Sequence, residues 1–237
     1  MGFRLALLMA SVFIFAACGK TDFQGPYDRQ VASTVGEAIP VDEDGDIENQ
    51  KEEEAPLISL RSKVLANSDL SEKALDNAFD FFIQNHMDIP NQKYISIFDI
   101  SQYSGNRRLY IINMETGNVS AIHTAHAKNS DVDHDGWATE FSNVNGSNKS
   151  SLGFMITAEE YVGKHGRSLR MDGLESRNSN VRSRAIVIHG ASYVDPSWDK
   201  MGRSLGCPAV SMDNINWVVD ALKEGSLFYI YHPSYDN

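Results

Sequence analysis

Ala185-Ile186-Val187-Ile188-His189-Gly190 is the stretch from which the organisation of this chain can be worked out. Its first four residues form a short, uninterrupted apolar run, which is typical of a strand buried inside a sheet. His189 and Gly190 follow directly after that run. We therefore predict a buried strand that delivers His189 at its end.

A cysteine follows this strand at a distance that one loop can span. Cys207 lies 18 residues after His189, within Gly202-Arg203-Ser204-Leu205-Gly206-Cys207-Pro208. A cysteine nucleophile acts as the thiolate, so it needs a lowered pKa or an adjacent base, and this loop can return Cys207 to His189. We expect Gly206 to permit a tight turn, with the amides of Gly206 and Cys207 directed at a developing oxyanion. The alternative is a buried cysteine that packs as a small hydrophobic residue.

The N-terminus is typical of an export signal. Arg4 supplies positive charge, residues 5–15 are apolar, and small residues follow at a cleavage site. The apolar run is shorter than the about 20 residues that a membrane-spanning helix needs. Phe15-Ala16-Ala17-Cys18 resembles a lipoprotein box, although its first position is usually Leu. We predict a lipoprotein signal peptide at residues 1–17 and lipidation of Cys18; plain secretion is the alternative.

Lipidation of Cys18 would leave Cys207 without a partner, because the chain has only these two cysteines. Exported proteins normally pair their cysteines in an oxidising compartment. A single thiol kept in such a compartment points to chemistry at that thiol. A Cys18–Cys207 disulfide is the remaining alternative, and it would tie the domain to its own N-terminus.

Acidic residues are concentrated in one segment. Residues 42–54 hold eight acidic residues and one lysine, which is −7 of the formal net charge of −11. Such a run is typical of a solvated, disordered segment. We predict an acidic disordered tether at residues 18–56, followed by a single domain at residues 57–237. Without a basic stripe, the composition argues against nucleic-acid binding.

The domain pattern is mainly β with flanking helices. Asp69 followed by Glu72 resembles a capping box, and the helix that follows should pack on a sheet through Phe79, Phe81 and Phe82. Residues 128–151 are rich in Asn, Ser, Asp and Gly, which indicates a long functional loop. Strands are predicted at residues 94–100, 109–114, 119–125, 153–157, 185–188 and 227–231, and a second helix from Ser211 or Asp213 to Gly225.

Longer motifs add a family resemblance. His189-Gly190 followed by Ser204-X-Gly206-Cys207 resembles the signature of the L,D-transpeptidase catalytic domain family, which remodels bacterial peptidoglycan. The similarity extends over about residues 57–232 and implies a β-sandwich or barrel with flanking helices. The other stretches that carry it are residues 126–130, 141–143, 151–153, 166–170, 184–190 and 202–209.

The resemblance implies two-step acyl transfer without a cofactor. Cys207 would attack the carbonyl of the third stem-peptide residue, diaminopimelate, releasing terminal D-Ala, while His189 takes and returns the proton. A backbone carbonyl near Gly190 would hold His189 in place of a third catalytic residue. The thioester would pass to an amine, giving a 3→3 crosslink, or to water, giving carboxypeptidase activity. The partners would be peptidoglycan stem peptides and, through the N-terminal lipid, the outer membrane on its periplasmic side.

The residues before Cys207 raise further hypotheses. Arg203 and Ser204 are candidates for substrate binding, Arg203 through a substrate carboxylate; a loop-bracing ion pair is the alternative for this arginine. Many family members have a histidine at the position of Leu205. That departure supports one rival function, a catalytically silent peptidoglycan-binding lipoprotein. A papain-like cysteine peptidase or amidase is a second rival, but it would require a cysteine before its histidine.

No metal site is predicted. Asp131-X-Asp133-X-Asp135-Gly136 imitates the start of a calcium loop, but its twelfth position is Ser142 and not Glu, so we interpret it as a solvated turn. No Cys or His partner lies at zinc spacing from His126 or His134. The remaining histidines and aromatics are interpreted as follows: His123, His165 and His232 as surface or packing residues, and Tyr161, Tyr193 and Trp198 as residues of the cleft or of the core.

Overall fold

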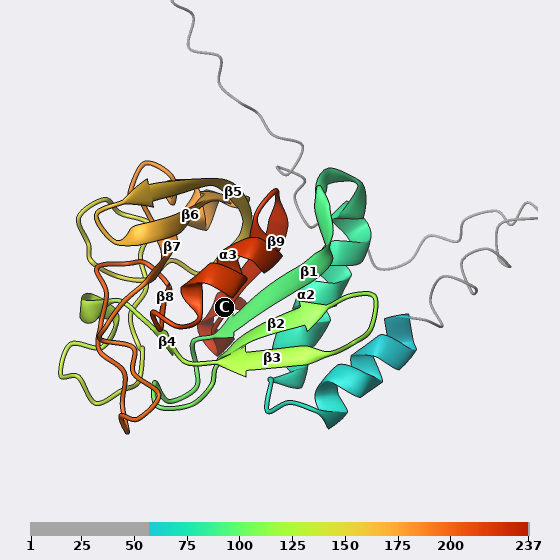
Figure 1. The fold of residues 1–237 in the computed structure, drawn as a ribbon, viewed down its shortest axis with the longest axis horizontal. Coiled ribbons are helices and arrows are strands. Elements are labelled where there is room, and N and C mark those ends of the chain that lie inside the picture. Colours follow the sequence, from blue (N-terminus) through green and yellow to red (C-terminus); the bar gives the residue numbers. More distant parts are fainter. Residues whose placement is uncertain (1–56, 237) are drawn as a thin grey trace, which may run out of the picture. The chain divides into compact units, whose positions relative to one another are not determined.

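A computed structural model describes residues 57–236, and a nine-stranded sheet dominates them (Figure 1). The strand order is β3-β2-β1-β9-β5-β6-β7-β8-β4. The strands are β1 (Asn91–Asp99), β2 (Leu109–Asn113), β3 (Val119–Ile122), β4 (Thr124–Ala125), β5 (Gly153–Gly163), β6 (Gly166–Gly173), β7 (Val187–Gly190), β8 (Ala209–Val210) and β9 (Ser226–Tyr231). Residues 57–66 are helical, and α2 (Glu72–Asn85), α3 (Ile215–Leu222) and the 3-10 turns η1 (His86–Asp88), η2 (Lys128–Ser130), η3 (Ser176–Asn178) and η4 (Pro233–Asp236) complete the list.

The central strands are apolar on both faces because each face meets a helix. Along β1, Ile95 and Ile97 join the cluster that contains Leu75 of α2, whereas Phe98 joins the cluster that contains Leu222 of α3. Successive side chains of a strand point to opposite faces, so an uninterrupted apolar run fills both clusters. Strands β2 and β9 alternate in the same way, and Figure 1 shows α2 and α3 on opposite sides of β1.

The two edges of the sheet are almost consecutive in sequence. Strand β3 forms one edge and β4 the other, and only His123 separates them. The sheet must therefore curl until its edges approach, which gives a nearly closed, barrel-like sheet. A closed sheet leaves few unpaired edge groups. The predicted fold class, mainly β with flanking helices, is confirmed.

Three elements differ from the prediction. Helix α2 begins after Ser71, whose hydroxyl accepts from the Ala74 amide at 3.4 Å, so Ser71 and not Asp69 is the N-cap. The strand expected at residues 119–125 is divided at His123 into the two edges of the sheet. Strand β6 was not predicted, because Leu169 and Met171 are its only apolar residues.

Some sequence predictions lie outside the described residues. The signal peptide at residues 1–17, the lipidation site Cys18 and the tether at residues 18–56 all precede the described part of the chain. Within residues 57–236, no helix has both the length and the apolar character needed to cross a bilayer.

The packing of Phe154 gives a test of the fold. This side chain of β5 is 6% exposed and stacks between Phe81 of α2 and Tyr229 of β9, with ring centroids 4.0 and 4.2 Å away. We expect Phe154→Ala to lower the free energy of unfolding by about 3 to 5 kcal/mol, measured by urea denaturation. Val162→Ala, on the same strand at 79% exposure, is the control and should change little. A loss below about 1 kcal/mol for Phe154→Ala would contradict this packing.

Candidate active site

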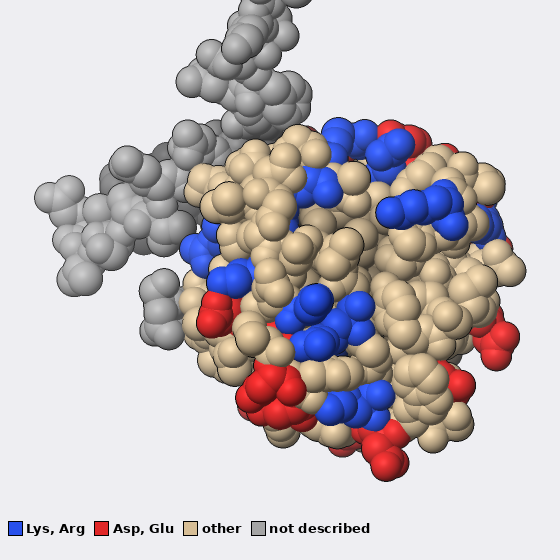
Figure 2. Space-filling view, turned by 90° about the vertical axis from the view of Figure 1, so that its left-hand side faces the viewer, with Lys and Arg blue, Asp and Glu red and all other residues tan. Residues whose placement is uncertain are grey.

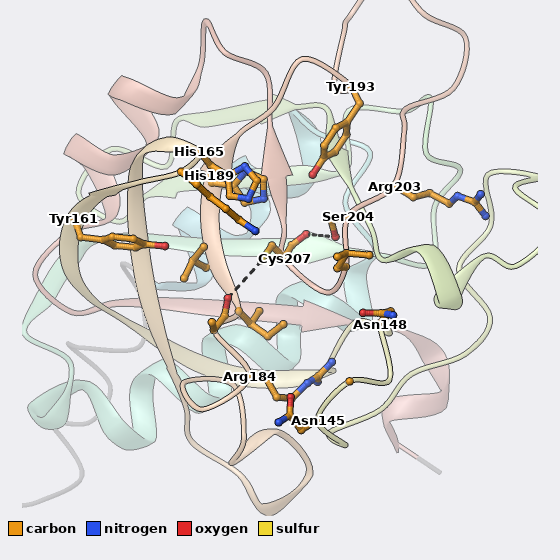
Figure 3. A pocket seen from close by; sticks show the side chains of 16 residues that line it. Asn145, Asn148, Tyr161, His165, Arg184, His189, Tyr193, Arg203, Ser204 and Cys207 are labelled. Atoms are coloured by element: carbon orange, nitrogen blue, oxygen red, sulfur yellow. Dashed lines mark hydrogen bonds between the residues drawn. The ribbon is translucent and has the colours of Figure 1, made fainter.

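Cys207 and His189 line one pocket of about 540 Å³. This volume lies within the range of about 300–1,000 Å³ that is usual for ligand sites. Figure 3 shows Tyr161 and Tyr193 entering the pocket from opposite sides, with Cys207 between them. The other lining residues are Asn145, Gly146, Asn148, Lys164, His165, Arg184, Ala185, Ile186, Val187, Arg203, Ser204 and Leu205.

Strand pairing is what brings the histidine and the cysteine together. Strands β7 and β8 run parallel, with His189 opposite Ala209 and Gly190 opposite Val210. Cys207 lies two residues before Ala209, so the continued register places it level with Val187. The chain between the two strands has the length of a single crossover loop, as the spacing of His189 and Cys207 predicts.

His189 is held as a neutral base. Its side chain is 2% exposed, and its Nδ1 lies 3.0 Å from the backbone oxygen of Gly190. A carbonyl oxygen only accepts, so Nδ1 carries the proton and Nε2 keeps a lone pair. Burial lowers the pKa of His189 below its ordinary value, which favours the uncharged ring. A neutral imidazole with a free Nε2 can accept a proton from a thiol.

His165 contacts His189 directly, which the sequence did not suggest. The two rings stack with centroids 4.3 Å apart and an interplanar angle of 24°. Gly163 pairs with Gly166 across the β5–β6 hairpin, so Lys164 and His165 form its two-residue tip. The interpretation of His165 as a surface or packing residue is confirmed, because it is exposed and stacks on His189, but it also lines the pocket. The Gly163-X-X-Gly166 pattern is the sequence signal for this hairpin turn, and it is interpretable only when β6 is also predicted.

The turn before Cys207 depends on Gly206 and Ser204. Gly206 has a φ of +140°, and a Cβ there would lie 2.4 Å from Cδ1 of Ile186, so only glycine fits. The Ser204 hydroxyl accepts from the Gly206 amide at 3.1 Å and donates to the Cys207 carbonyl at 2.6 Å. Ser204 therefore closes the turn and is 4% exposed, with its hydroxyl engaged by the backbone of the turn.

This turn also corrects the expected oxyanion donors. The Gly206 amide is occupied by Ser204, so it cannot also serve a substrate oxygen. The Cys207 amide makes no hydrogen bond within residues 57–236. The sequence predicts the amides of Gly206 and Cys207 as oxyanion donors, and of these two only the Cys207 amide is available.

The Cys207 thiol is partly buried among backbone groups. Its Sγ donates a long hydrogen bond of 3.7 Å to the Ala185 carbonyl, and the Val187 amide donates to Sγ. Burial raises the pKa of Cys207, while the Val187 amide and the charges of Lys164 and Arg184 oppose that rise. Because the net shift is upward, the resting group is a thiol and needs the base.

Arg203 braces a neighbouring loop. Its guanidinium donates to the backbone oxygens of Lys128, Asp131 and Val132. Figure 3 shows Arg203 directed away from Cys207. These contacts correspond to the bracing alternative for Arg203, although the partners are carbonyl groups and not an acidic side chain.

A buried polar network lies beneath this loop. His126 accepts from Arg108 through Nδ1 at 2.8 Å and donates from Nε2 to Asp131 at 3.0 Å. Burial, with Arg108 alongside, lowers the pKa of His126 to about 4, so the ring is neutral at pH 7. The His126 backbone oxygen accepts from the Ser204 amide at 2.8 Å. The network therefore supports the turn that carries Cys207.

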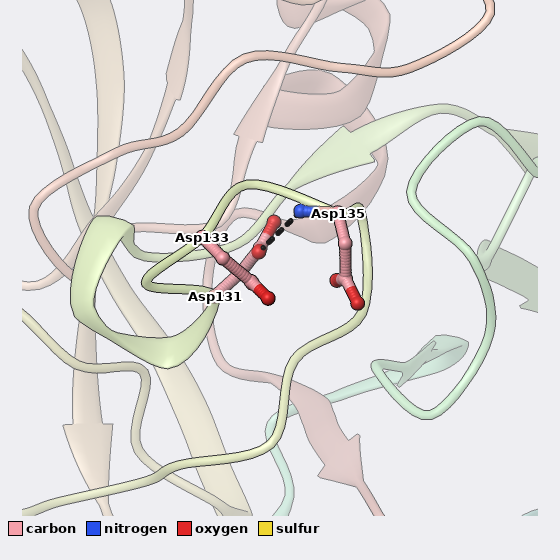
Figure 4. Close-up of side chains that lie close together, drawn as sticks. All are labelled: Asp131, Asp133 and Asp135. Carbon is pink, nitrogen blue, oxygen red and sulfur yellow. Dashed lines mark hydrogen bonds between the residues drawn. The ribbon is translucent and has the colours of Figure 1, made fainter.

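The acidic loop has an internal structural role. The carboxylates of Asp131, Asp133 and Asp135 approach within 4.8 Å of one another (Figure 4). Asp131 is buried, however, and its two oxygens accept from the Asp135 amide at 2.9 Å, the Gly136 amide at 3.1 Å and His126. The predicted solvated turn is therefore wrong for Asp131, while Asp133 and Asp135 are exposed.

The pocket is cationic although the chain is acidic. Lys164, Arg184 and Arg203 line the pocket, and its lining includes no Asp or Glu among the described residues. Figure 2 shows Lys and Arg side chains near the middle of the face that carries β6 to β8, with most acidic side chains towards its rim. Such a charge distribution favours anionic ligands.

Comparison with known proteins gives a family match. The L,D-transpeptidase catalytic domain family matches residues 66–231, which is most of the chain. No curated protein matches the chain.

Several solved structures are similar in shape. An L,D-transpeptidase from Mycobacterium smegmatis is 12% identical, with a TM-score of 0.38, over 59% of this chain and 59% of that chain. L,D-transpeptidase 3 from Mycobacterium tuberculosis is 11% identical, with a TM-score of 0.40, over 59% of this chain and 61% of that one. The chain thus spans about three fifths of the length of these structures.

The Gly206 turn can be tested by substitution. We expect Gly206→Ala to lower the free energy of unfolding by about 3 kcal/mol. The added Cβ would overlap Cδ1 of Ile186, and the φ of +140° is unfavourable for alanine. The control is Gly146→Ala, where φ is +74° and no atom lies within 4 Å of the added Cβ; it should cost about 1 kcal/mol. Equal losses in urea denaturation would contradict the contact with Ile186.

The resting thiol predicts a pH dependence. Because burial raises the pKa of Cys207, its thiolate fraction at pH 7 should be smaller than that of a free cysteine. We expect its alkylation by iodoacetamide to titrate above about 8.5, the ordinary thiol value, when peptide mass spectrometry follows the rate. Urea-unfolded protein, in which Cys207 titrates normally, is the control. A rate already at its plateau at pH 6 would reveal a preformed thiolate instead.

Proposed function

We propose that this chain, which belongs to the L,D-transpeptidase catalytic domain family, transfers acyl groups from peptidoglycan stem peptides through Cys207. The observation that carries the proposal is the shared pocket, which is lined by the thiol of Cys207 and by His189, whose Nε2 makes no hydrogen bond within residues 57–236. The pairing of β7 with β8 brings the two residues to this pocket. The family membership argues against a papain-like peptidase, as does the order of histidine before cysteine.

The first step forms a thioester. As the Sγ–H proton of Cys207 moves to Nε2 of His189, Sγ attacks the carbonyl carbon of the third stem residue, diaminopimelate. The Cys207 amide, which makes no hydrogen bond within residues 57–236, would donate to the oxygen that becomes negative. When the carbon–nitrogen bond breaks, the imidazolium of His189 returns the proton to the leaving amine, and D-Ala departs.

The second step regenerates the thiol. An amine of a neighbouring stem attacks the thioester carbon and gives a proton to Nε2 of His189, the carbon–sulfur bond breaks, and Cys207 recovers that proton. The product is a 3→3 crosslink. Water in place of the amine gives a tripeptide, which is the carboxypeptidase reaction. The same two residues serve both outcomes.

The charge of the pocket supports stem peptides as substrates. A tetrapeptide stem presents carboxylates on D-Ala and on diaminopimelate, and the pocket lining is cationic. Tyr161 and Tyr193 add aromatic surface on either side of Cys207. Arg170 lies over the Tyr161 ring at 4.3 Å from its centroid and fixes that side chain.

We also propose a place for the enzyme in the cell. Phe15-Ala16-Ala17-Cys18 supports lipid attachment at Cys18. The acidic run at residues 42–54 would extend by self-repulsion and hold the domain away from the membrane. Together these features support an enzyme anchored in the outer membrane, facing the peptidoglycan from the periplasmic side.

A test of the function uses disaccharide-tetrapeptide fragments of peptidoglycan. Wild-type protein should yield tripeptide, crosslinked dimer or both, and intact-mass analysis should detect the tripeptidyl thioester on Cys207. Cys207→Ala should give none of these, and His189→Gln should lower the rate by about 10²- to 10⁴-fold, because proton transfer is lost. The ratio of dimer to tripeptide reports which acceptor is used.

Leu205 provides the discriminating variant. Its side chain is 64% exposed at the rim of the pocket, in the position where many relatives carry histidine. If His189 is the base, Leu205→His should leave the rate of thioester formation within a few fold of wild type. An inactive wild type that gains activity through Leu205→His would favour the silent-lipoprotein alternative, and inactivity of both proteins would remove the enzyme function.

A further inference from the structure

We infer that Lys164 binds the terminal carboxylate of the stem peptide, the one carried by the departing D-Ala. This inference rests on the proposed function and adds a specificity-determining residue to it. Lys164 lies at the tip of the β5–β6 hairpin and lines the pocket that contains Cys207 and His189.

Of the three cations that line the pocket, two are committed to the protein itself. Arg184 donates to the backbone oxygens of Ser142 and Lys149 and to the hydroxyls of Ser147 and Ser151. Arg203 donates to three loop carbonyls. The Arg184 guanidinium would have to give up such bonds before it could pair with a ligand. The Arg203 side chain is directed away from Cys207 (Figure 3) and would have to turn towards it.

Lys164 is the cation that remains available. Within residues 57–236 its ammonium group has neither a hydrogen bond nor an ion pair. Its backbone is nevertheless fixed, because Gly163 pairs with Gly166 and the adjacent His165 ring stacks on His189. The ammonium is exposed, so a substrate carboxylate can replace its water without breaking bonds within the protein.

The position of Lys164 selects one carboxylate among those of the stem. The neighbouring His165 touches His189, so Lys164 lies on the histidine side of the pocket. Its charge also acts on both His189 and Cys207. His189 must protonate the leaving amine, and the D-Ala carboxylate is one carbon away from that amine. A cation near both residues is therefore closest to this carboxylate.

The test compares two substrates that differ only in this charge. One is a tetrapeptide stem that ends in D-Ala, and the other ends in D-alaninamide. For the free acid, Lys164→Met should raise KM about tenfold, with a smaller change in kcat, because a charge-assisted contact is lost. Wild type should show the same tenfold preference for acid over amide, and Lys164→Met should abolish that preference. Lys164→Arg should restore most of it.

Controls separate this contact from general attraction of anions. Lys93→Met removes an exposed lysine that does not line the pocket, and it should leave both KM values unchanged. The amide retains the other carboxylates of the stem. A Lys164→Met loss of equal size on acid and amide would therefore overturn the inference, because it would reflect the overall charge of the pocket.

Binding without turnover distinguishes failure of the inference from failure of the proposed function. Calorimetry on Cys207→Ala and on Cys207→Ala/Lys164→Met gives Kd for both peptides. If wild type forms no thioester but Cys207→Ala prefers the acid in a Lys164-dependent way, the enzyme function fails and the inference stands. If thioester forms and the acid preference is independent of Lys164, or if neither peptide binds, the inference fails.

Discussion

The parallel pairing of β7 with β8 is the constraint on which the site depends. Two hydrogen-bonded positions, His189 with Ala209 and Gly190 with Val210, set a base at the end of one strand beside a cysteine at the entry to the next. So short a pair cannot persist alone. It is held because β8 also pairs with β4, and because the Ser204 turn is bonded to the backbone of His126. Closure of the barrel-like sheet and the geometry of the site therefore depend on the same strand, β8.

Much of this arrangement follows from local sequence, since apolar runs, glycine positions and the interval between His189 and Cys207 are short-range signals. Residues 185–188 predict a buried strand; β7 is buried throughout, but it begins two residues later, at Val187, and includes His189 and Gly190. Partners distant in sequence could not be predicted. Nothing near Ser204 indicates that its amide binds the backbone oxygen of His126, and nothing near Arg203 indicates carbonyls of residues 128–132 as acceptors. The segment expected as one strand at residues 119–125 forms two strands, β3 and β4, and only closure of the sheet requires this break.

The errors share a physical cause. Several polar residues are buried and satisfied by one another, among them Arg108, His126 and Asp131. Asp131 looked like part of a solvated acidic turn, but it receives two amides and the His126 ring, and Arg108 completes that network. A buried polar group is tolerated only when its hydrogen bonds are made, and pairwise spacing in sequence does not reveal such a set of partners.

Burial also determines how the site can react. It raises the pKa of the Cys207 thiol and lowers that of His189, so the uncharged pair is favoured at rest. Proton transfer must then accompany attack on the substrate. The charges that would favour the thiolate belong to Lys164 and Arg184, at the rim of the same pocket. An anionic substrate that meets the charge of Lys164 thus lies close to the place where the reaction develops negative charge.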